Sequence, residues 1–296
     1  MTKLGLLFAG QGAQHPGMGA QLYETSAAAR DLFNQADAIL GWPLTKLCFE
    51  GPQEELTACA HCQPAIYTTS LAAWAARQRA METGVHPTIA GGLSLGELAA
   101  FTVAGAFDFE TGLKVVAERG RLMDELCQRT HGAMAAVLGG EPDRITEVAD
   151  AHGIDVANYN CPGQWIISGE AEAIQAACAV LSPEVMKIVP LEVAGAYHSR
   201  LMRPAGDAFR AYLENIPMVS PSLPVVHNVT GELANPDPAV LRERLAEQIY
   251  SPVRWEECCR VIMRECDKLL ELGPGQVLTG LARRIDRRFP AEATAL

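Results

Sequence analysis

The stretch Thr88-Ile-Ala-Gly-Gly-Leu-Ser-Leu-Gly-Glu-Leu-Ala-Ala100 decides the fold, because an apolar run passes through a Gly-x-Ser-x-Gly turn into residues that favour a helix. This pattern predicts a nucleophile elbow, a sharp strand-to-helix bend that holds Ser94 clear of the backbone. Glycines stand at 92 and 96, where a side chain would crowd a strained turn. The N-terminal amides of the following helix would face any negative charge that develops near Ser94.

Composition bounds the function. The chain has 296 residues, 49% of them hydrophobic, which suits one large domain or two unequal ones. A formal net charge of -11 argues against a nucleic-acid partner. No apolar run has the length of a membrane span, and the N-terminus lacks the layout of a signal peptide. We therefore expect a cytoplasmic protein with no membrane partner.

Nine cysteines indicate reduced, structural thiols, because an odd number scattered through helical segments does not suit a disulfide framework. Cys59-Ala-His-Cys62 resembles half a zinc site, but no second Cys-x-x-Cys pair follows at finger spacing, so no metal is expected. Cys161 is the exception to a purely structural interpretation, since its loop could reach an active cleft.

Strand-like and helix-like segments alternate, which predicts an α/β protein. Up to residue 128, the patterns favour strands at 4–9 and 88–92 and helices at 19–40, 63–83, 95–104 and 109–127, the last capped by Asp108. From 132 to 193 they favour strands at 134–139, 154–159, 164–168 and 185–193 and helices at 142–152 and 170–181. The remainder favours strands at 224–229 and 268–272 and helices at 237–249 and 255–265, with a last helix after Gly273-Pro-Gly275.

The middle segment has the order βαββαβ, which is that of a ferredoxin-like unit able to form its own small sheet. We therefore predict a ferredoxin-like subdomain over 129–196, inserted into a large α/β domain formed by 1–128 and 197–296.

A serine hydroxyl needs a base to remove its proton as it attacks. His198 is the candidate, because it follows a strand at the return from the predicted subdomain and has small neighbours that leave its ring room to project. The alternative is a hinge histidine satisfied by backbone groups. His15, beside the first Gly-rich turn, is the weaker second candidate.

Arg119 is the most informative charge. It falls in the apolar stripe of the helix at 109–127, between Val116 and Met123, whereas Arg121 lies on the opposite, charged face. An arginine on an inward face needs an anionic partner, because a buried guanidinium without one is costly. That partner is either an internal carboxylate or the carboxylate of a ligand, which the planar guanidinium would hold bidentately.

The turn Gly10-Gln-Gly-Ala-Gln14 lacks the Lys-Ser/Thr of a phosphate-binding loop and the spacing of a dinucleotide fingerprint. We interpret it instead as a source of a backbone amide. The amides of Gln11 and Leu95 would together form an oxyanion hole beside Ser94.

Taken together, the chain resembles the malonyl-CoA:acyl carrier protein transacylases of fatty-acid and polyketide synthesis. The matching segments keep the family's order and span nearly the whole chain: 8–14, 63–65, 92–97, 119–123, 158–164, 195–199, 228–231, 248–255 and 271–275. The resemblance implies a hydrolase-like domain with a parallel-sheet core and a ferredoxin-like lid.

The resemblance also implies roles. Ser94 would be the acylated nucleophile, His198 its base and later acid, and Arg119 the group that grips the malonyl carboxylate. The backbone carbonyl of Gln248 would orient the histidine in place of an acid. Two further residues would line the acyl pocket, Asn160 and Tyr197.

Two departures from the family pattern stand beside the site. Leu93 occupies the position before the serine where the family often carries histidine, and Tyr197 stands where phenylalanine is common.

The function implied is ping-pong transfer of malonyl from malonyl-CoA to the phosphopantetheine thiol of an acyl carrier protein, without a cofactor. An acidic carrier protein needs a basic patch, for which the candidates are Arg200, Arg203, Arg283, Arg284, Arg287 and Arg288. Alternatives are a polyketide-dedicated or methylmalonyl-accepting acyltransferase, a serine (thio)esterase, and a catalytically inert scaffold. An α/β-hydrolase usually places several strands before its elbow and Asp then His after it, unlike this chain.

Overall fold

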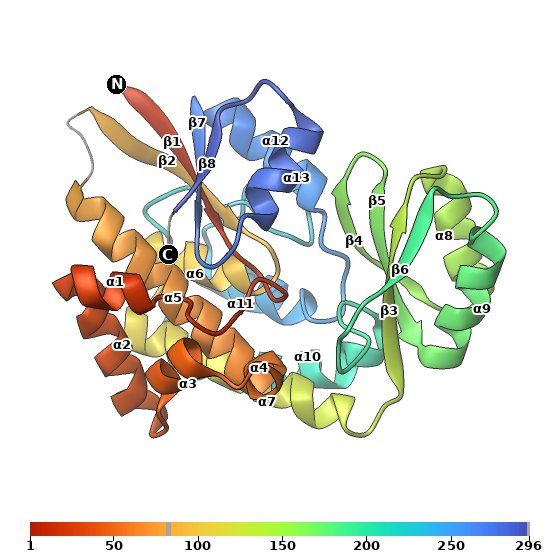
Figure 1. The fold of residues 1–296 in the computed structure, drawn as a ribbon, viewed down its shortest axis with the longest axis horizontal. Helices are drawn as coiled ribbons and strands as arrows, with labels where there is room; N and C mark the ends of the chain where they lie inside the picture. Colours follow the sequence, from red (N-terminus) through yellow and green to blue (C-terminus); the bar gives the residue numbers. More distant parts are fainter. Residues whose placement is uncertain (81–83, 295–296) are drawn as a thin grey trace.

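A computed structural model describes residues 1–80 and 84–294 of the chain. Two separate four-stranded sheets organise it (Figure 1). The first sheet is parallel and has the strand order β2-β1-β7-β8, formed by β1 (Thr2–Phe8), β2 (Val85–Gly92), β7 (Lys268–Leu272) and β8 (Ala291–Ala293). The α/β class and the parallel-sheet core are therefore confirmed.

Helices cover both faces of the parallel sheet. Successive side chains of a strand point to opposite faces, so alternate residues of β1 enter two different core clusters. Leu6 and Phe8 of β1 enter the larger core cluster, which also takes in helices α2, α5, α6 and α7. Leu7 enters a second cluster with α12 and α13. The helices on the first side are α1 (Ala20–Thr25), α2 (Ala27–Leu40), α3 (Leu44–Glu50), α4 (Gln53–Thr57), α5 (Cys59–Ala80), α6 (Leu95–Val103), α7 (Phe109–Cys127), α10 (Arg203–Leu213) and α11 (Pro238–Glu247).

The second sheet is antiparallel and has the order β4-β5-β3-β6. Its elements follow the chain as β3 (Gly132–Leu138), α8 (Pro142–Ala151), β4 (Asp155–Cys161), β5 (Gln164–Glu170), α9 (Ala171–Leu181) and β6 (Lys187–Pro190). This is the βαββαβ order that the sequence predicts, and its own core cluster lies between the sheet and the two helices. The exact domain boundaries, 129–196 against 1–128 and 197–296, stay a prediction.

The small sheet is linked to the large domain through β4. The amide of Tyr159 donates to the carbonyl of Val253, and the amide of Val253 donates to the carbonyl of Ala157, at 2.9 and 2.8 Å. Val253 precedes α12 (Trp255–Glu265), which covers the parallel sheet together with α13 (Val277–Ile285). The small unit is therefore anchored beside the carboxyl ends of β1 and β2.

Several predicted elements differ from the observed ones. The helix expected at 19–40 is interrupted at Ser26, where the backbone is extended. The Ser26 side-chain oxygen caps α2 by accepting from the amide of Ala29. The helix expected at 63–83 begins earlier, at Cys59, and its expected last residues, 81–83, lie outside the described residues. The strand expected at 224–229 forms only isolated bridges, Ala90 with Val225 and Val226 with Leu233.

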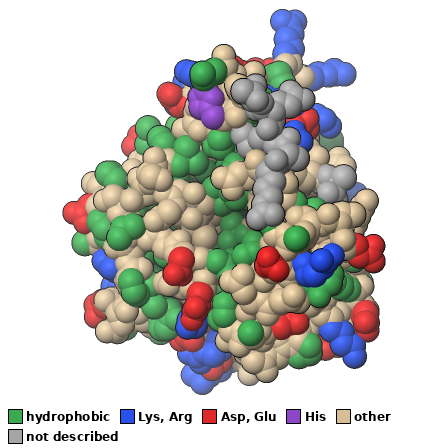
Figure 2. All heavy atoms as spheres, turned by 90° about the vertical axis from the view of Figure 1, so that its left-hand side faces the viewer, with side chains coloured by type: hydrophobic (Ala, Val, Ile, Leu, Met, Phe, Trp, Pro, Cys, Tyr) green, Lys and Arg blue, Asp and Glu red, His purple; other side chains and the backbone are tan. Residues whose placement is uncertain are grey.

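The surface carries charges of both signs. On the face seen in Figure 2, acidic and basic side chains alternate around a strip of hydrophobic ones, with no broad field of one sign. Across the described part of the chain, the helices are too short or too polar to span a bilayer.

Candidate functional site

Ser94 occupies a strained turn between β2 and α6. Its φ of 52° and ψ of -103° are unusual for a residue with a side chain. The glycines around it are required by close packing. A Cβ on Gly96 would lie 2.0 Å from the carbonyl oxygen of Phe8, and one on Gly92 would lie 2.1 Å from the carbonyl carbon of Gly96. The turn thus holds the hydroxyl at the end of the parallel sheet.

Asn228 locks this elbow in place. Its Oδ1 accepts from the Ser94 amide at 2.7 Å, and its Nδ2 donates to the Gly92 carbonyl at 2.9 Å. One buried side chain therefore satisfies backbone groups on both arms of the turn, which offsets part of its strain. Sequence reasoning did not assign Asn228 a role, although it lies in one of the segments that carry the resemblance.

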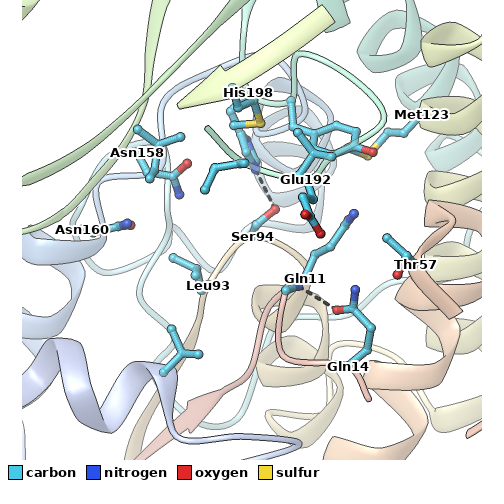
Figure 3. Close-up of a pocket in the computed structure, with 17 residues that line it drawn as sticks. Gln11, Gln14, Thr57, Leu93, Ser94, Met123, Asn158, Asn160, Glu192 and His198 are labelled. Carbon is cyan, nitrogen blue, oxygen red and sulfur yellow. Dashed lines mark hydrogen bonds between the residues drawn. The ribbon is translucent and has the colours of Figure 1, made fainter. Parts of the chain in front are cut away.

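The structure brings Ser94 and His198 together. Ser94 Oγ lies 2.7 Å from His198 Nε2 (Figure 3). His198 Nδ1 lies 2.8 Å from the carbonyl oxygen of Gln248. A carbonyl only accepts, so Nδ1 carries the proton and the neutral ring presents Nε2 as an acceptor to the serine hydroxyl. His198 itself has a positive φ, 57°, which turns its ring toward the elbow.

Burial, together with the nearby Arg119 charge, lowers the pKa of His198 to about 4. The imidazole is therefore neutral near pH 7 and able to take up a proton from Ser94. Among the described residues, the usual third position of a catalytic triad is taken by the Gln248 carbonyl instead of a carboxylate.

Arg119 lies directly beside the serine. Its guanidinium is buried, with a residue exposure of 1%, and Nη2 donates to Ser94 Oγ at 3.0 Å. Its other partners are the side-chain oxygens of Gln63, at 2.7 Å, and Gln248, at 3.0 Å. Within the described residues no carboxylate reaches ion-pair distance of it. Burial lowers the pKa of Arg119 to about 10, which still leaves it charged near neutrality.

Of the two alternatives for Arg119, an internal carboxylate is therefore not found. The protein instead surrounds the Arg119 charge with neutral amide oxygens. Unlike a carboxylate, these oxygens do not neutralise the guanidinium, so its charge stays available to an incoming anion. The Nη2 edge of the guanidinium meets the reacting hydroxyl, so an incoming carboxylate would bind next to the acylated atom. Gln63 and Gln248 supply these contacts through side chains that the sequence did not single out.

A cavity of about 370 Å³ opens above Ser94 and His198, between the two sheets. Its lining is mainly apolar or amide-bearing: Gln11, Gly12, Gln14, Thr57, Leu93, Met123, Met134, Asn158, Asn160, Ile166, Leu191, Glu192, Val193, Tyr197 and Val277. In Figure 3, Asn158 and Asn160 lie on the side opposite Gln14 and Thr57. The predicted pocket residues Asn160 and Tyr197 both line this cavity.

The amides assigned to an oxyanion hole lie on either side of the serine. Gln11 lines the cavity, and Leu95 is the first residue of α6, directly after Ser94. In the described turns and loops, neither amide donates to a protein acceptor. Both are therefore free to face a developing oxyanion, which remains a proposed role.

The polarity expected from Tyr197 is largely taken up inside the protein. Its hydroxyl accepts from the Cys59 thiol at 3.0 Å, and burial raises its pKa. Asn160 behaves differently, because its buried Oδ1 has no hydrogen-bond partner. Asn160 thus carries a buried, unpaired acceptor at the cavity wall, whereas Tyr197 offers mainly ring surface.

Two weaker expectations are resolved by the structure. The segment that carries Cys161 does reach the cavity, through Asn158 and Asn160. The Cys161 side chain is instead buried in the cluster with α12 and α13. His15 is exposed and faces the carbonyl of Pro16 rather than Ser94. Arg121 pairs with Glu118 and Glu125 on the solvated face of α7, as its position indicates. Among the described residues, His, Cys, Asp and Glu side chains form no group of three suited to a metal ion.

Comparison with known proteins identifies the family. The family model described as "Acyl transferase domain" matches residues 6–279. The chain belongs to the acyl transferase family. It is 39% identical to a malonyl CoA-acyl carrier protein transacylase of Bacillus subtilis, covering all of this chain and 94% of that protein.

Solved structures of this acyl transferase family agree closely with the fold. An acyl carrier protein S-malonyltransferase from Vibrio cholerae has a TM-score of 0.93 and 35% identity, covering 99% of this chain and 97% of that one. A malonyl-transacylase solved with a type II PKS acyl-carrier protein has a TM-score of 0.94 and 35% identity, covering 99% of this chain and 96% of that one.

Leu93 is one of the two residues at which this acyl transferase departs from the family pattern, the other being Tyr197. Its backbone keeps the elbow geometry, since its amide donates to the Phe8 carbonyl and its carbonyl accepts from the Gly96 amide. Its side chain lines the cavity. An apolar surface therefore stands beside Ser94 where an imidazole is common in the family.

Proposed function

We propose that this chain transfers a malonyl group from malonyl-CoA to the phosphopantetheine thiol of an acyl carrier protein. The observation that carries the proposal is the buried Arg119 guanidinium, which touches Ser94 Oγ and is held only by neutral oxygens. Among the described residues its hydrogen-bond partners are all neutral oxygens, and such a cation beside a nucleophile favours an acyl group that ends in a carboxylate. A simple esterase has no need of it.

The first half-reaction forms an acyl-serine. His198 Nε2 takes the proton of Ser94 Oγ while the oxygen attacks the thioester carbonyl carbon. The amides of Gln11 and Leu95 stabilise the tetrahedral oxyanion. The C–S bond then breaks, and His198 returns the proton to the departing sulfur of coenzyme A.

The second half-reaction runs the same steps in reverse order. The thiol of the carrier protein gives its proton to His198 and attacks the seryl ester, and Ser94 leaves as the alkoxide and regains the proton. His198 serves as both base and acid, and the two backbone amides stabilise the oxyanion. The proposed steps therefore use no metal or cofactor in either half. The mainly apolar cavity wall limits competing water.

The pathway that supplies the carrier protein has two candidates, fatty-acid and polyketide synthesis. Fatty-acid synthesis is our first choice, and the polyketide alternative draws support from the similarity to a transacylase solved with a type II PKS acyl-carrier protein. Methylmalonyl acceptance is the finer question within either pathway. Turnover with carrier proteins of each pathway separates them.

For docking of the carrier protein, the exposed Arg287 and Arg288 are the better candidates. Arg200 is already paired with Asp155, and Arg284 donates to Gln164, so both are less available. Reversing the charge at 287 and 288 should raise the KM for the carrier protein and leave that for malonyl-CoA unchanged. An unchanged carrier-protein KM would exclude this patch.

The setting we propose is the cytoplasm. The nine cysteines, all within the described residues, are unpaired, as expected in a reducing compartment.

The test of the proposed function is intact-mass analysis after incubation with malonyl-CoA. We expect a gain of one malonyl group that maps to Ser94, is absent in Ser94→Ala, and is discharged by holo-carrier protein. Appearance of free malonate without transfer to the carrier thiol would indicate a hydrolase instead. Absence of any adduct or transfer would refute the proposal.

A further inference from the structure

A chain of buried polar groups runs behind the site, from Glu97 on α6 through the side chain of Gln248 to Arg119 on α7. Gln248 Nε2 donates to Glu97 Oε2 at 2.6 Å and to the Ser94 carbonyl at 3.0 Å. Gln248 Oε1 accepts from Arg119 Nη2 at 3.0 Å. Glu97 and Gln248 are both fully buried, with 0% exposure.

These contacts fix which way the Gln248 amide faces. An amide can in principle present its oxygen or its nitrogen in either direction. The Ser94 carbonyl can only accept, and Arg119 can only donate, so each requires the orientation that is observed. A flipped amide would bring its NH₂ group against the guanidinium and its oxygen against Glu97.

Glu97 is the strongest of these constraints. Its Oε2 also accepts from the backbone amide of Asn228, at 3.1 Å, so two donors converge on one oxygen. The other oxygen, Oε1, lies 3.2 Å from Nε2 of the buried His227. Burial raises the pKa of Glu97 to about 8.

We propose that the Gln248 side chain, held in one orientation by Glu97, is a positioning residue that aims Arg119 at the acyl carboxylate. Neither Glu97 nor Gln248 is among the residues that line the cavity. Gln248 would act on the substrate through Arg119 and His198. The same residue orients the base through its backbone carbonyl and the carboxylate-binding group through its side chain. Acyl selectivity and base orientation are thereby tied to one position.

This inference rests on the proposed function, because it assigns a cause to malonyl selectivity. The main test is Gln248→Met, which keeps the backbone carbonyl for His198 and removes every side-chain hydrogen bond. With active sites counted by a fluorophosphonate that labels Ser94, we expect kcat/KM for malonyl-CoA to fall by about tenfold or more. The value for acetyl-CoA should fall less, so that the malonyl-to-acetyl ratio drops by about fivefold or more, because acetyl has no carboxylate for Arg119 to bind.

Two variants at Glu97 complete the test. Glu97→Met removes the acceptor and should reproduce the loss of malonyl selectivity. Glu97→Gln should restore it, because the Asn228 amide requires an oxygen at the Oε2 position and so orients the new amide to accept. A matched control is Glu271→Gln, which changes another buried carboxylate, one that caps α13 through the amides of Leu278 and Thr279.

The outcomes separate cleanly. An unchanged malonyl-to-acetyl ratio in Gln248→Met, with Ser94 still labelled, would overturn the inference. Equal losses for both substrates, or the same ratio change in Glu271→Gln, would also overturn it, because they indicate a general structural effect. If the wild-type protein showed no malonyl preference, the proposed function would fail instead. Should Glu97→Met not fold, the Gln248→Met ratio decides alone.

Discussion

Replacement of Arg119 by alanine tests the proposed basis of acyl selectivity directly. A guanidinium binds a carboxylate through two parallel charge-assisted hydrogen bonds, each contributing about 1.5–3 kcal/mol. Loss of both would cost roughly 3–6 kcal/mol if nothing replaced them. Water entering the vacated space recovers part of this, so we expect kcat/KM for malonyl-CoA to fall by about 100- to 1,000-fold.

Acetyl-CoA provides the internal comparison. Its transfer does not use the carboxylate contact, and in the wild type it leaves the buried charge of Arg119 without an anion. We therefore expect its kcat/KM to stay within about tenfold of the wild type. The malonyl-to-acetyl ratio should fall by at least about tenfold even if the alanine variant loses some general activity.

Arg119→Lys is the matched control. It keeps a positive charge but not the planar fork, so malonyl selectivity should lie between those of the wild type and the alanine variant. Rates are measured with both thioesters and one carrier protein, per Ser94 labelled by a fluorophosphonate. A malonyl-to-acetyl ratio that is the same in all three proteins would refute the role assigned to Arg119.

Three further predictions follow from the geometry. Gly96→Ala should cost about 3 kcal/mol or more of unfolding free energy or prevent folding, because its Cβ would lie 2.0 Å from the Phe8 carbonyl oxygen, and urea denaturation measures this. The rate of Ser94 labelling should fall only as the pH drops through about 4, because His198 must be neutral to act as base and its pKa is lowered to about 4. A fall centred near pH 6.5 would contradict the burial of that ring. Asp108→Ala should cost about 1 kcal/mol in urea denaturation with unchanged turnover, because it removes the acceptor for the Thr111 amide at the start of α7.

Local sequence signals predicted much of the fold. The strand at 268–272 and the helix at 255–265 are found with the predicted bounds, and Asp108 caps its helix as expected. These elements have strong apolar periodicity or a clear capping residue, both of which act over a few neighbours. The βαββαβ order of elements along the chain from β3 to β6 could be predicted for the same reason.

Other elements depend on contacts distant in sequence. The segment 224–229 has the apolar pattern of a strand, yet it forms only two isolated bridges, Val225 with Ala90 and Val226 with Leu233. Strand β8 was missed, since its three residues form a strand only by pairing with β7. Pairing of this kind is set by the assembled core rather than by local preference.

The site shows the same division. Ser94, His198 and Arg119 could be singled out because a strained turn, a small-residue neighbourhood and a charge in an apolar stripe are visible in the sequence. The roles of Glu97 and the Gln248 side chain could not, because a buried polar residue is intelligible only once its partners are known.

The absence of an acid behind His198 follows from the charge that the site must hold. In the function we propose, Arg119 meets a substrate carboxylate, and a protein carboxylate at the position of the Gln248 carbonyl would lie within the same buried space and compete for that charge. A backbone carbonyl orients the imidazole and fixes its tautomer without adding a net charge. The side-chain amide oxygen of Gln248 then accepts from the guanidinium of Arg119. This neutral acceptor binds the guanidinium more weakly than a carboxylate does, so a substrate carboxylate can compete with it. Under this proposal, selectivity for a carboxylate-bearing acyl group and the use of a Ser–His pair without an acid are two consequences of one electrostatic requirement.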